Sequence, residues 1–292
     1  HRPQAGETIV EPVPAQALIT FESGMEGLRA ITRDHAQMIA GGLAVDLESR
    51  IPQGASILTT LMPGSFTALS TSLMMWLTSG GALHLRNPSE MADDIAVWGA
   101  IEADTLVMPT PYALKLHAAG AFGADSKIKR IVALWRSPEQ VAGSAAFNHP
   151  RIHFIDLYAF GEAGHVAATR GLAGTPAPIM PGMQYAPRNG SKASPVGYLN
   201  VAGRGTLCLR GPMVPVQSYQ VPASNSLRPA SQFAPPASAQ PDVDTGYIAR
   251  IDKKADGAMT ITAPPAGLVS AGFYRFNGDE LQAIAEKAGA ET

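Results

Sequence analysis

Few residues in this sequence are spaced in a way that would by itself carry out known chemistry. His149 and His153 lie four residues apart, the spacing at which two imidazoles on one helix face can share a metal ion. Pro150 stands between them and disfavours a common helix, so we expect surface or core histidines there. The sequence has no Walker phosphate loop, no GxGxxG after a strand, no paired CxxC and no GxSxG elbow. Generic motifs alone therefore indicate only a soluble α/β domain.

The spacing of apolar residues in the first part of the chain predicts strands and helices in alternation. Strands are expected at Ala17–Phe21, Ser56–Leu61, Ala82–Leu85, Thr105–Met108, Ile128–Leu134 and Ile152–Leu157. Helices are expected at Asp34–Leu47 (with Asp34 as a candidate cap), Phe66–Leu77, Met91–Ile101, Tyr112–Ala119 and Pro138–Ala146. Because the connections are short, this alternation indicates an α/β fold with a mainly parallel sheet flanked by helices.

Beyond Gly171 the pattern changes to short strand-like runs separated by Gly and Pro. These runs indicate a small β-unit and lie at Gly197–Val201, Gly205–Leu209, Tyr247–Ile251 and Ala258–Thr262. Within this unit, Pro222–Pro241 is dense in Pro, Ala, Ser and Gln and predicts an irregular loop. Asp279–Ala288 is expected to close the chain as a short amphipathic helix. We predict three parts, at residues 1–172, 173–262 and 263–292.

Composition and charge narrow the function classes. The formal net charge is −2 and the basic residues are scattered, so we expect no nucleic-acid partner. Between Arg50 and Arg86 the only potentially charged side chain is His84, but the apolar core Leu69–Leu77 is shorter than the ~20 residues of a spanning helix. We therefore expect no membrane span. The single cysteine, Cys208, leaves no internal disulfide, and with no charged and apolar leader visible we expect a cytoplasmic location.

A series of weak motifs is more informative, because the motifs occur in a fixed order. A strand leads to the glycine-containing segment Glu22–Gly27, and a Pro-led segment at Met62–Phe66 precedes a Ser- and Thr-rich helix. A strand ending in Pro109 follows, then the segment Asp156–Gly164, and then the turn Asp244–Tyr247. Three of these segments resemble motifs of the adenylate-forming (AMP-binding) ligases, the superfamily of the acyl-CoA synthetases. The segment Glu22–Gly27 resembles the phosphate loop TSGTTGxPK, Asp156–Gly164 resembles the YGxTE motif, and Asp244–Tyr247 resembles the TGD motif. The resemblance extends over nearly the whole chain.

The resemblance implies an ATP-dependent ligase that joins a small carboxylic acid to AMP and releases pyrophosphate. Most members of the family then pass the acyl group to a thiol, usually that of CoA or of a carrier pantetheine. ATP and Mg²⁺ are therefore the expected cofactors, and an acyl carrier protein or a second ligase-like subunit is a candidate partner. By the same resemblance, residues 263–292 are expected to be the hinge and the truncated start, a stub, of a mobile C-terminal lid domain.

The position of each residue in its motif assigns the expected ligand contacts. The expected phosphate contacts are Ser23, Gly24, Gly27 and Arg29. The expected Mg²⁺ ligand is Glu162. The other nucleotide contacts that the motifs imply are Tyr158, Gly161, Asp244 and Thr245.

Several positions differ from the family in ways that disfavour ATP. Thr residues of the family are replaced by Glu22, Met25, Glu26 and Gly161, and the Asp of TGD is replaced by Tyr247. At ~5 Å and an effective dielectric constant of ~20, each like-charge pair between Glu26 and the triphosphate would cost roughly 3 kcal/mol. That exceeds the ~0.5–1.5 kcal/mol of each lost hydroxyl contact. We therefore expect weak binding of ATP·Mg²⁺ or none. The alternative function is a catalytically inactive ligase-like scaffold or binding subunit in an acyl or biosynthetic pathway.

Two further segments depart from the family. Leu134-Trp135-Arg136 stands where a Gly-Gly-Ala turn lies against the adenine and the acyl group, so large side chains are expected to fill that space. The hinge segment Ala263–Gly267 lacks the Arg and the Asp of the family's hinge motif.

Each of these features also has a purely structural interpretation. The segment Ser23–Gly27 could be a plain turn between strands, and Asp244-Thr245-Gly246 could equally be a turn. Glu162 could be a carboxylate at a helix N-terminus, and Tyr158 could be a packing residue at a strand end. Trp135 and Arg136 could stack on each other at the surface.

Overall fold

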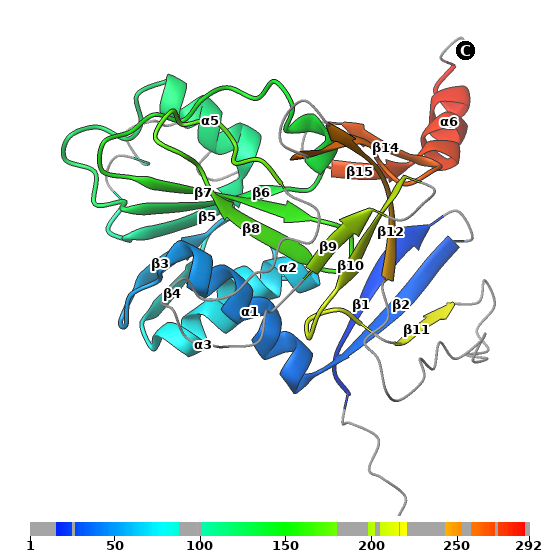
Figure 1. The fold of residues 1–292 in the computed structure, drawn as a ribbon, viewed down its shortest axis with the longest axis horizontal. Helices are drawn as coiled ribbons and strands as arrows, with labels where there is room; N and C mark the ends of the chain where they lie inside the picture. Colours follow the sequence, from blue (N-terminus) through cyan, green and yellow to red (C-terminus); the bar gives the residue numbers. More distant parts are fainter. Residues whose placement is uncertain are drawn as a thin grey trace, which may run out of the picture.

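The centre of the molecule is a six-stranded sheet with the order β4-β3-β5-β6-β7-β8 (Figure 1). The computed structural model describes residues 16–24, 27–87, 98, 101–179, 198–201, 205–215, 217–220, 243–252, 258–271 and 274–289. The strands of this sheet are β3 (Ser56–Thr59), β4 (Ala82–Leu85), β5 (Thr105–Pro109), β6 (Arg130–Trp135), β7 (His153–Ala159) and β8 (His165–Thr169). All neighbouring pairs are parallel except β7 and β8, which are antiparallel. The predicted mainly parallel sheet is confirmed.

Helices cover both faces of this sheet, as predicted. One face carries α1 (His35–Ser49), α2 (Phe66–Leu69) and α3 (Met75–Ser79), and the other carries α5 (Thr110–Ala118). On β6, Ile131 and Ala133 pack in the core that contains Tyr112 of α5. Val132, one position along, packs in the core that contains Val45 of α1. Because successive strand residues point to opposite faces, a strand covered on both sides must be apolar at every position.

The start of α1 is fixed by side-chain hydrogen bonds. The Asp34 carboxylate accepts from the Gln37 backbone N–H at 2.8 Å, and the Gln37 amide oxygen accepts from the Asp34 N–H at 2.9 Å. This reciprocal capping box satisfies two backbone donors that the first turn leaves free. The predicted cap at Asp34 is confirmed. The helix ends at Arg50, which adopts a left-handed conformation with φ of 52°.

The helix predicted at Phe66–Leu77 is present but is not uniform. A π-helical turn at Ser70–Met74 separates α2 from α3. The buried hydroxyls of Thr71 and Ser72 donate to the carbonyls of Thr67 and Ala68, at 2.9 and 2.6 Å. Internal hydrogen bonds of this kind let a Ser- and Thr-rich segment lie in the core. Among the residues that the structure describes, no helix is long and apolar enough to cross a membrane.

One predicted helix is wrong and another lies outside the described residues. The segment Pro138–Ala146 forms only a single 3₁₀ turn at Pro138–Gln140. Gly143 then takes a φ of 83°, which an α-helix does not accommodate, and redirects the chain. The helix predicted at Met91–Ile101 falls on residues that are not described, except Trp98 and Ile101, which are buried. The irregular loop predicted at Pro222–Pro241 also lies outside the described residues.

Small antiparallel sheets pack beside the main sheet (Figure 1). One has the order β1-β2-β11, with β1 (Gln16–Gly24), β2 (Gly27–Asp34) and β11 (Gln217–Gln220). Another has the order β13-β12-β10-β9, with β9 (Tyr198–Val201), β10 (Thr206–Arg210), β12 (Val243–Asp252) and β13 (Ala258–Ala263). The hairpin β14 (Leu268–Ala271) and β15 (Tyr274–Asn277) leads into α6 (Gly278–Lys287). These strands confirm the expected small β-unit, and the limits of the three parts stay a prediction.

A carboxylate lies half-buried between α1 and α3. Asp46 accepts a hydrogen bond from the Thr78 hydroxyl, and its other oxygen, Oδ1, is buried without a hydrogen-bond partner. Burial raises the pKa of Asp46 from 3.8 to about 6, and the Thr78 hydroxyl opposes that shift. A folded-state pKa above the unfolded value means that the charged form disfavours folding. The protonated Asp46 carboxyl group stabilises the folded state at acid pH. This stabilisation is lost as the pH rises from 3.8 to about 6.

We predict that Asp46→Asn stabilises the protein above pH 6. The amide keeps an acceptor for Thr78 but cannot ionise, so the gain should be absent near pH 4 and reach a plateau above pH 6. We expect about 1 kcal/mol after allowing for solvent screening of a half-buried group. Urea unfolding at pH 4, 6 and 8 measures it. The control is Glu102→Gln, which removes an exposed carboxylate that pairs with Lys127 and should change little at any pH. A uniform effect of Asp46→Asn at all three pH values would contradict the prediction.

Candidate functional site

The predicted phosphate loop is the turn of the β1–β2 hairpin. In the register of the two strands, Gly24 faces Gly27 and Glu22 faces Arg29. The Arg29 guanidinium donates to Glu22 Oε2 at 3.1 Å, so the acidic residue in this loop already has a cation beside it. Ser23 pairs with Leu28. Met25 and Glu26 lie outside the described residues, so the expected repulsion between Glu26 and a triphosphate stays a prediction.

Two of the departures from the family motifs fit each other in space. Glu22 Oε1 accepts a hydrogen bond from the backbone N–H of Glu162 at 3.1 Å. To reach that position the carboxylate passes over Gly161, where a Cβ atom would lie 1.9 Å from Glu22 Oε1. Gly161 also has a φ of 57°, which favours glycine. The Glu22 carboxylate therefore fills the space that a threonine at position 161 would need.

Glu162, the expected metal ligand, is buried and closely surrounded. Its Oε2 accepts from the Thr20 hydroxyl at 2.6 Å and from the Phe66 backbone N–H at 3.1 Å. Arg33 Nη1 lies 3.6 Å from the same oxygen. Burial raises the pKa of Glu162, and the contacts with Thr20, Arg33 and Phe66 oppose that shift. The carboxylate thus has donors and a counter-ion from the protein itself.

These surroundings do not fit a magnesium ion. Mg²⁺ requires near-octahedral oxygen ligands and keeps several waters. At Glu162 the Arg33 guanidinium already supplies a positive charge, and only 6% of the Glu162 surface is exposed. Within the described residues, no group of three or more His, Cys, Asp or Glu side chains could hold a metal ion. A divalent cation bound through Glu162 Oε2 would meet the positive charge of Arg33.

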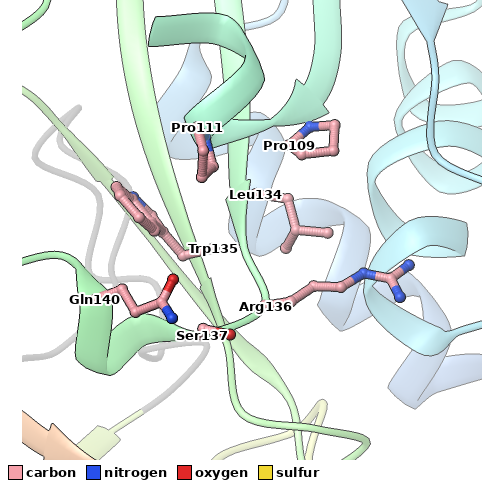
Figure 2. Close-up of a pocket in the computed structure, with 7 residues that line it drawn as sticks. All are labelled: Pro109, Pro111, Leu134, Trp135, Arg136, Ser137 and Gln140. Carbon is pink, nitrogen blue, oxygen red and sulfur yellow. The ribbon is translucent and has the colours of Figure 1, made fainter. Parts of the chain in front are cut away.

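Trp135 is a core residue that is anchored by a buried ion pair. Its Nε1–H donates to Asp156 Oδ1 at 2.8 Å. Arg170 holds the same carboxylate with two hydrogen bonds, at 2.8 and 3.0 Å. The interpretation of Trp135 and Arg136 as a stacked surface pair is wrong, because they point to opposite sides of β6 (Figure 2). Tyr158, which pairs with Trp135 on the neighbouring strand, is fully buried.

The predicted ribose region is an Asx turn inside the first part of β12, where the pairing with β10 is irregular. Asp244 accepts from the Gly246 backbone N–H at 2.8 Å and from the Thr206 hydroxyl at 3.0 Å. The Thr245 hydroxyl donates to the Leu207 carbonyl at 2.7 Å. Both polar side chains therefore hold the turn against β10.

Tyr247, which follows this turn, is fully buried. Its ring packs edge-on against Phe160, with centroids 5.5 Å apart. Its hydroxyl donates to the Arg136 carbonyl at 3.5 Å, which is a long hydrogen bond. Burial raises the pKa of Tyr247, so its hydroxyl stays neutral near neutral pH. Tyr247 therefore packs the core where the family motif has a ribose acceptor.

A pocket lies at the carboxyl ends of β5 and β6 (Figure 2). Its cavity volume is about 10 Å³, room for about one water molecule, and its lining residues are Pro109, Pro111, Leu134, Trp135, Arg136, Ser137 and Gln140. The Ser137 side chain is buried and its Oγ has no hydrogen-bond partner. In open α/β sheets, ligands bind at the carboxyl ends of the strands. A guanidinium and a hydroxyl are groups that can donate hydrogen bonds to an anion, but a carboxylic acid would need the pocket to open further.

Two arginines near these groups were not predicted from the sequence. Arg33 lies two residues after the buried Ile31 on β2, and residues two apart on a strand point to the same face. A charged residue at a core-facing strand position was therefore the signal in the sequence that could have identified Arg33. Arg275 on β15 stands 5.0 Å over the Tyr247 ring and donates to the Arg136 carbonyl at 2.7 Å. Nothing in the sequence around Arg275 indicated that β15 returns to the end of β6.

No family model matches the sequence, and no curated protein matches it. Solved structures do match. A double mutant of o-succinylbenzoate CoA synthetase (MenE) from Bacillus subtilis has a TM-score of 0.61 and 15% identity, over 92% of this chain and 53% of that one. An adenylation-containing structure of a keto acid-selecting NRPS module has a TM-score of 0.59 and 11% identity, over 94% of this chain and 26% of that one. The Klebsiella oxytoca NpsA N-terminal subdomain has a TM-score of 0.52 and 15% identity, over 84% and 63%.

At these identities the similarity concerns the fold, which runs through nearly all of this chain. The chain spans about half the length of the MenE structure and a smaller share of the NRPS structure. The resemblance that the order of the motifs indicated is thereby confirmed at the level of the fold. The chain therefore shares its fold with these structures of a CoA synthetase and of an adenylation-containing module.

Proposed function

We propose that this chain belongs to an ATP-dependent ligase that activates a small carboxylic acid. The observation that carries the proposal is the pocket at the carboxyl ends of β5 and β6, with Arg136 and Ser137 beside apolar side chains. The matched MenE structure is bound with a product analogue of its CoA ligase reaction, and the matched NpsA subdomain holds 3-hydroxybenzoyl-AMSN. Both are proteins of the same fold, which supports a carboxylate-activating reaction for this chain.

In the proposed reaction a carboxylate oxygen of the acid attacks the α-phosphorus of ATP, and pyrophosphate leaves. The thiol of CoA or of a carrier pantetheine then attacks the acyl carbon, and AMP leaves. The Arg136 guanidinium orients the carboxylate, the Ser137 hydroxyl donates to it, and Trp135 packs against the acyl group.

The proposed phosphate contacts are on the β1–β2 hairpin. They are Arg29 and the turn formed by Ser23, Gly24 and Gly27. No step is assigned to Mg²⁺, because the surroundings of Glu162 do not fit it. The remaining proposed contacts of the nucleotide, from the register of the motifs, are Tyr158, Gly161, Asp244 and Thr245. The Asp244 and Thr245 side chains already make hydrogen bonds within the protein.

A second candidate is a ligase-like scaffold without ATP chemistry, for which an acyl carrier protein or a second ligase-like subunit is the proposed partner. The observation that favours it is that side chains of the protein lie at positions expected to contact ATP and its metal ion. Arg33 lies beside Glu162, the expected metal ligand, and the ring of Tyr247 is buried where the family motif has a ribose acceptor. The matched MenE structure gives it no support, since MenE is a CoA synthetase. Calorimetry with ATP separates the two candidates, because micromolar binding would count against the scaffold.

We predict that the complete natural chain releases pyrophosphate in the presence of ATP and a suitable acid. A panel of fatty and aromatic acids, with hydroxylamine to trap the acyl-adenylate, is the direct assay. Arg136→Ala should raise KM for the acid about tenfold or more, since a charge-assisted hydrogen bond contributes ~1.5–3 kcal/mol. The matched control is Lys127→Ala, which removes an exposed cation that is paired with Glu102. Failure of every acid would sink the ligase proposal.

We predict that Tyr247→Asp does not create a nucleotide site. The substitution restores the acid of the family motif, but it removes a ring packed on Phe160 and buries a carboxylate, which should destabilise the fold by at least ~3 kcal/mol. Tyr247→Phe keeps the ring and loses only a long hydrogen bond, so about 1 kcal/mol or less is expected. Urea unfolding and calorimetry with ATP measure the two effects. A tenfold gain in ATP affinity for Tyr247→Asp would contradict the prediction.

A further inference from the structure

We propose that the Arg33 guanidinium is a permanent internal cation that takes the place of a divalent metal ion beside Glu162. Glu162 then anchors the β1–β2 hairpin to the core and is not a metal ligand. This inference does not rest on the proposed ligase activity, because metal binding and the ion pair can both be measured without turnover.

The guanidinium is held from three directions. Its Nε donates to the Met213 carbonyl at 3.4 Å, and its Nη2 donates to the Glu162 carbonyl. Its plane lies over the Phe66 ring, 3.7 Å from the centroid, and 1% of Arg33 is exposed. Nη1 makes no hydrogen bond and points its charge at Glu162 Oε2, 3.6 Å away. A side chain fixed in this way cannot move aside without opening the core.

One oxygen of the carboxylate, Oε2, is engaged by the protein from several sides. Glu162 Oε2 already accepts from Thr20 and from the Phe66 backbone, as well as facing Arg33. The other carboxylate nearby, Glu22, uses its two oxygens for Arg29 and for the Glu162 backbone N–H. A hard cation needs about six oxygen ligands. Here three of the four oxygens of Glu162 and Glu22 are engaged with protein donors or with Arg33, so the two carboxylates offer too few ligands for such an ion.

Burial and pairing act on these two groups in opposite directions. Burial lowers the pKa of Arg33 to about 10, and Glu162 and Glu22 oppose that shift, so the guanidinium keeps its proton at neutral pH. Burial raises the pKa of Glu162, and the hydrogen bonds from Thr20 and the Phe66 backbone and the charge of Arg33 oppose that shift. The neighbouring His165, whose Nε2 donates to the Gly41 carbonyl at 3.0 Å, has its pKa lowered to about 4 by burial and is neutral. Arg33 is therefore the cation that balances Glu162.

The first experiment is a double-substitution cycle read by thermal unfolding at pH 8. Glu162→Gln leaves a buried guanidinium unpaired, and Arg33→Met leaves a buried carboxylate unpaired, so each should lower Tm by about 10 °C. The double variant Arg33→Met with Glu162→Gln should recover at least half of the summed loss. Additive losses would overturn the proposal, because they would show that the two side chains do not depend on each other.

The second experiment measures Mn²⁺ binding by electron paramagnetic resonance, with and without ATP. For the unchanged chain and for Glu162→Gln we expect the same Mn²⁺ affinity. Arg33→Met should bind Mn²⁺ at least about tenfold more tightly, since removal of the cation exposes Glu162 and Glu22 to the metal. Adding Glu162→Gln to Arg33→Met should remove that gain.

Two further comparisons of Mn²⁺ affinity complete this test. Arg33→Lys keeps a positive charge beside Glu162, so it should not gain Mn²⁺ affinity even if its Tm falls. The unchanged chain and Glu162→Gln can be compared even if Arg33→Met fails to fold. A tenfold loss of Mn²⁺ affinity on Glu162→Gln in the unchanged background, or no gain in a folded Arg33→Met, would overturn the proposal.

Discussion

Strands β5, β6 and β7 are covered on both faces, and this constraint decides where the molecule can place a ligand. On β6, alternate side chains pack into two different cores, one with α5 and one with α1. A polar side chain inside such a strand must be fully paired, as Asp156 of β7 is with Arg170 and Trp135, so groups free to meet a ligand are expected at the strand ends. Arg136 and Ser137 follow β6 directly, and the pocket forms there together with the end of β5. The location of the site is thus a consequence of how the core is covered.

The same constraint explains which features of the fold could be predicted from the sequence. Apolar runs such as those of β5 and β6 are visible because a doubly covered strand must be apolar throughout, and the cap at Asp34 is visible because it depends on residues three positions apart. The helix prediction for the segment after Pro138 was wrong because the left-handed conformation of Gly143, and not the spacing of apolar residues, decides the path of the chain there. Local patterns predict local structure well when the competing signals are also local.

The environment of the candidate site could not be predicted in this way. Glu22 and Gly161 are 139 positions apart in the chain, and in the sequence they look like two independent losses of a family threonine. In the structure the Glu22 carboxylate fills the space beside Gly161 that a threonine side chain would need. Arg33 and Glu162 form a comparable pair. No short-range pattern links such residues, because their contacts depend on how the β1–β2 hairpin packs on the turn between β7 and β8. The order of the motifs predicted the fold, and the structure was needed to relate the substitutions to each other.

These paired substitutions bear on how the site is stabilised. A bound metal ion stabilises a fold only in proportion to its concentration relative to its dissociation constant. A guanidinium that belongs to the chain is present at all times, but its desolvation must be offset by the contacts that surround it. Arg33 has such contacts, with two carbonyls, an aromatic face and a carboxylate. The β1–β2 hairpin is therefore held in place by the folded chain alone, and its position beside Glu162 does not depend on an external ion.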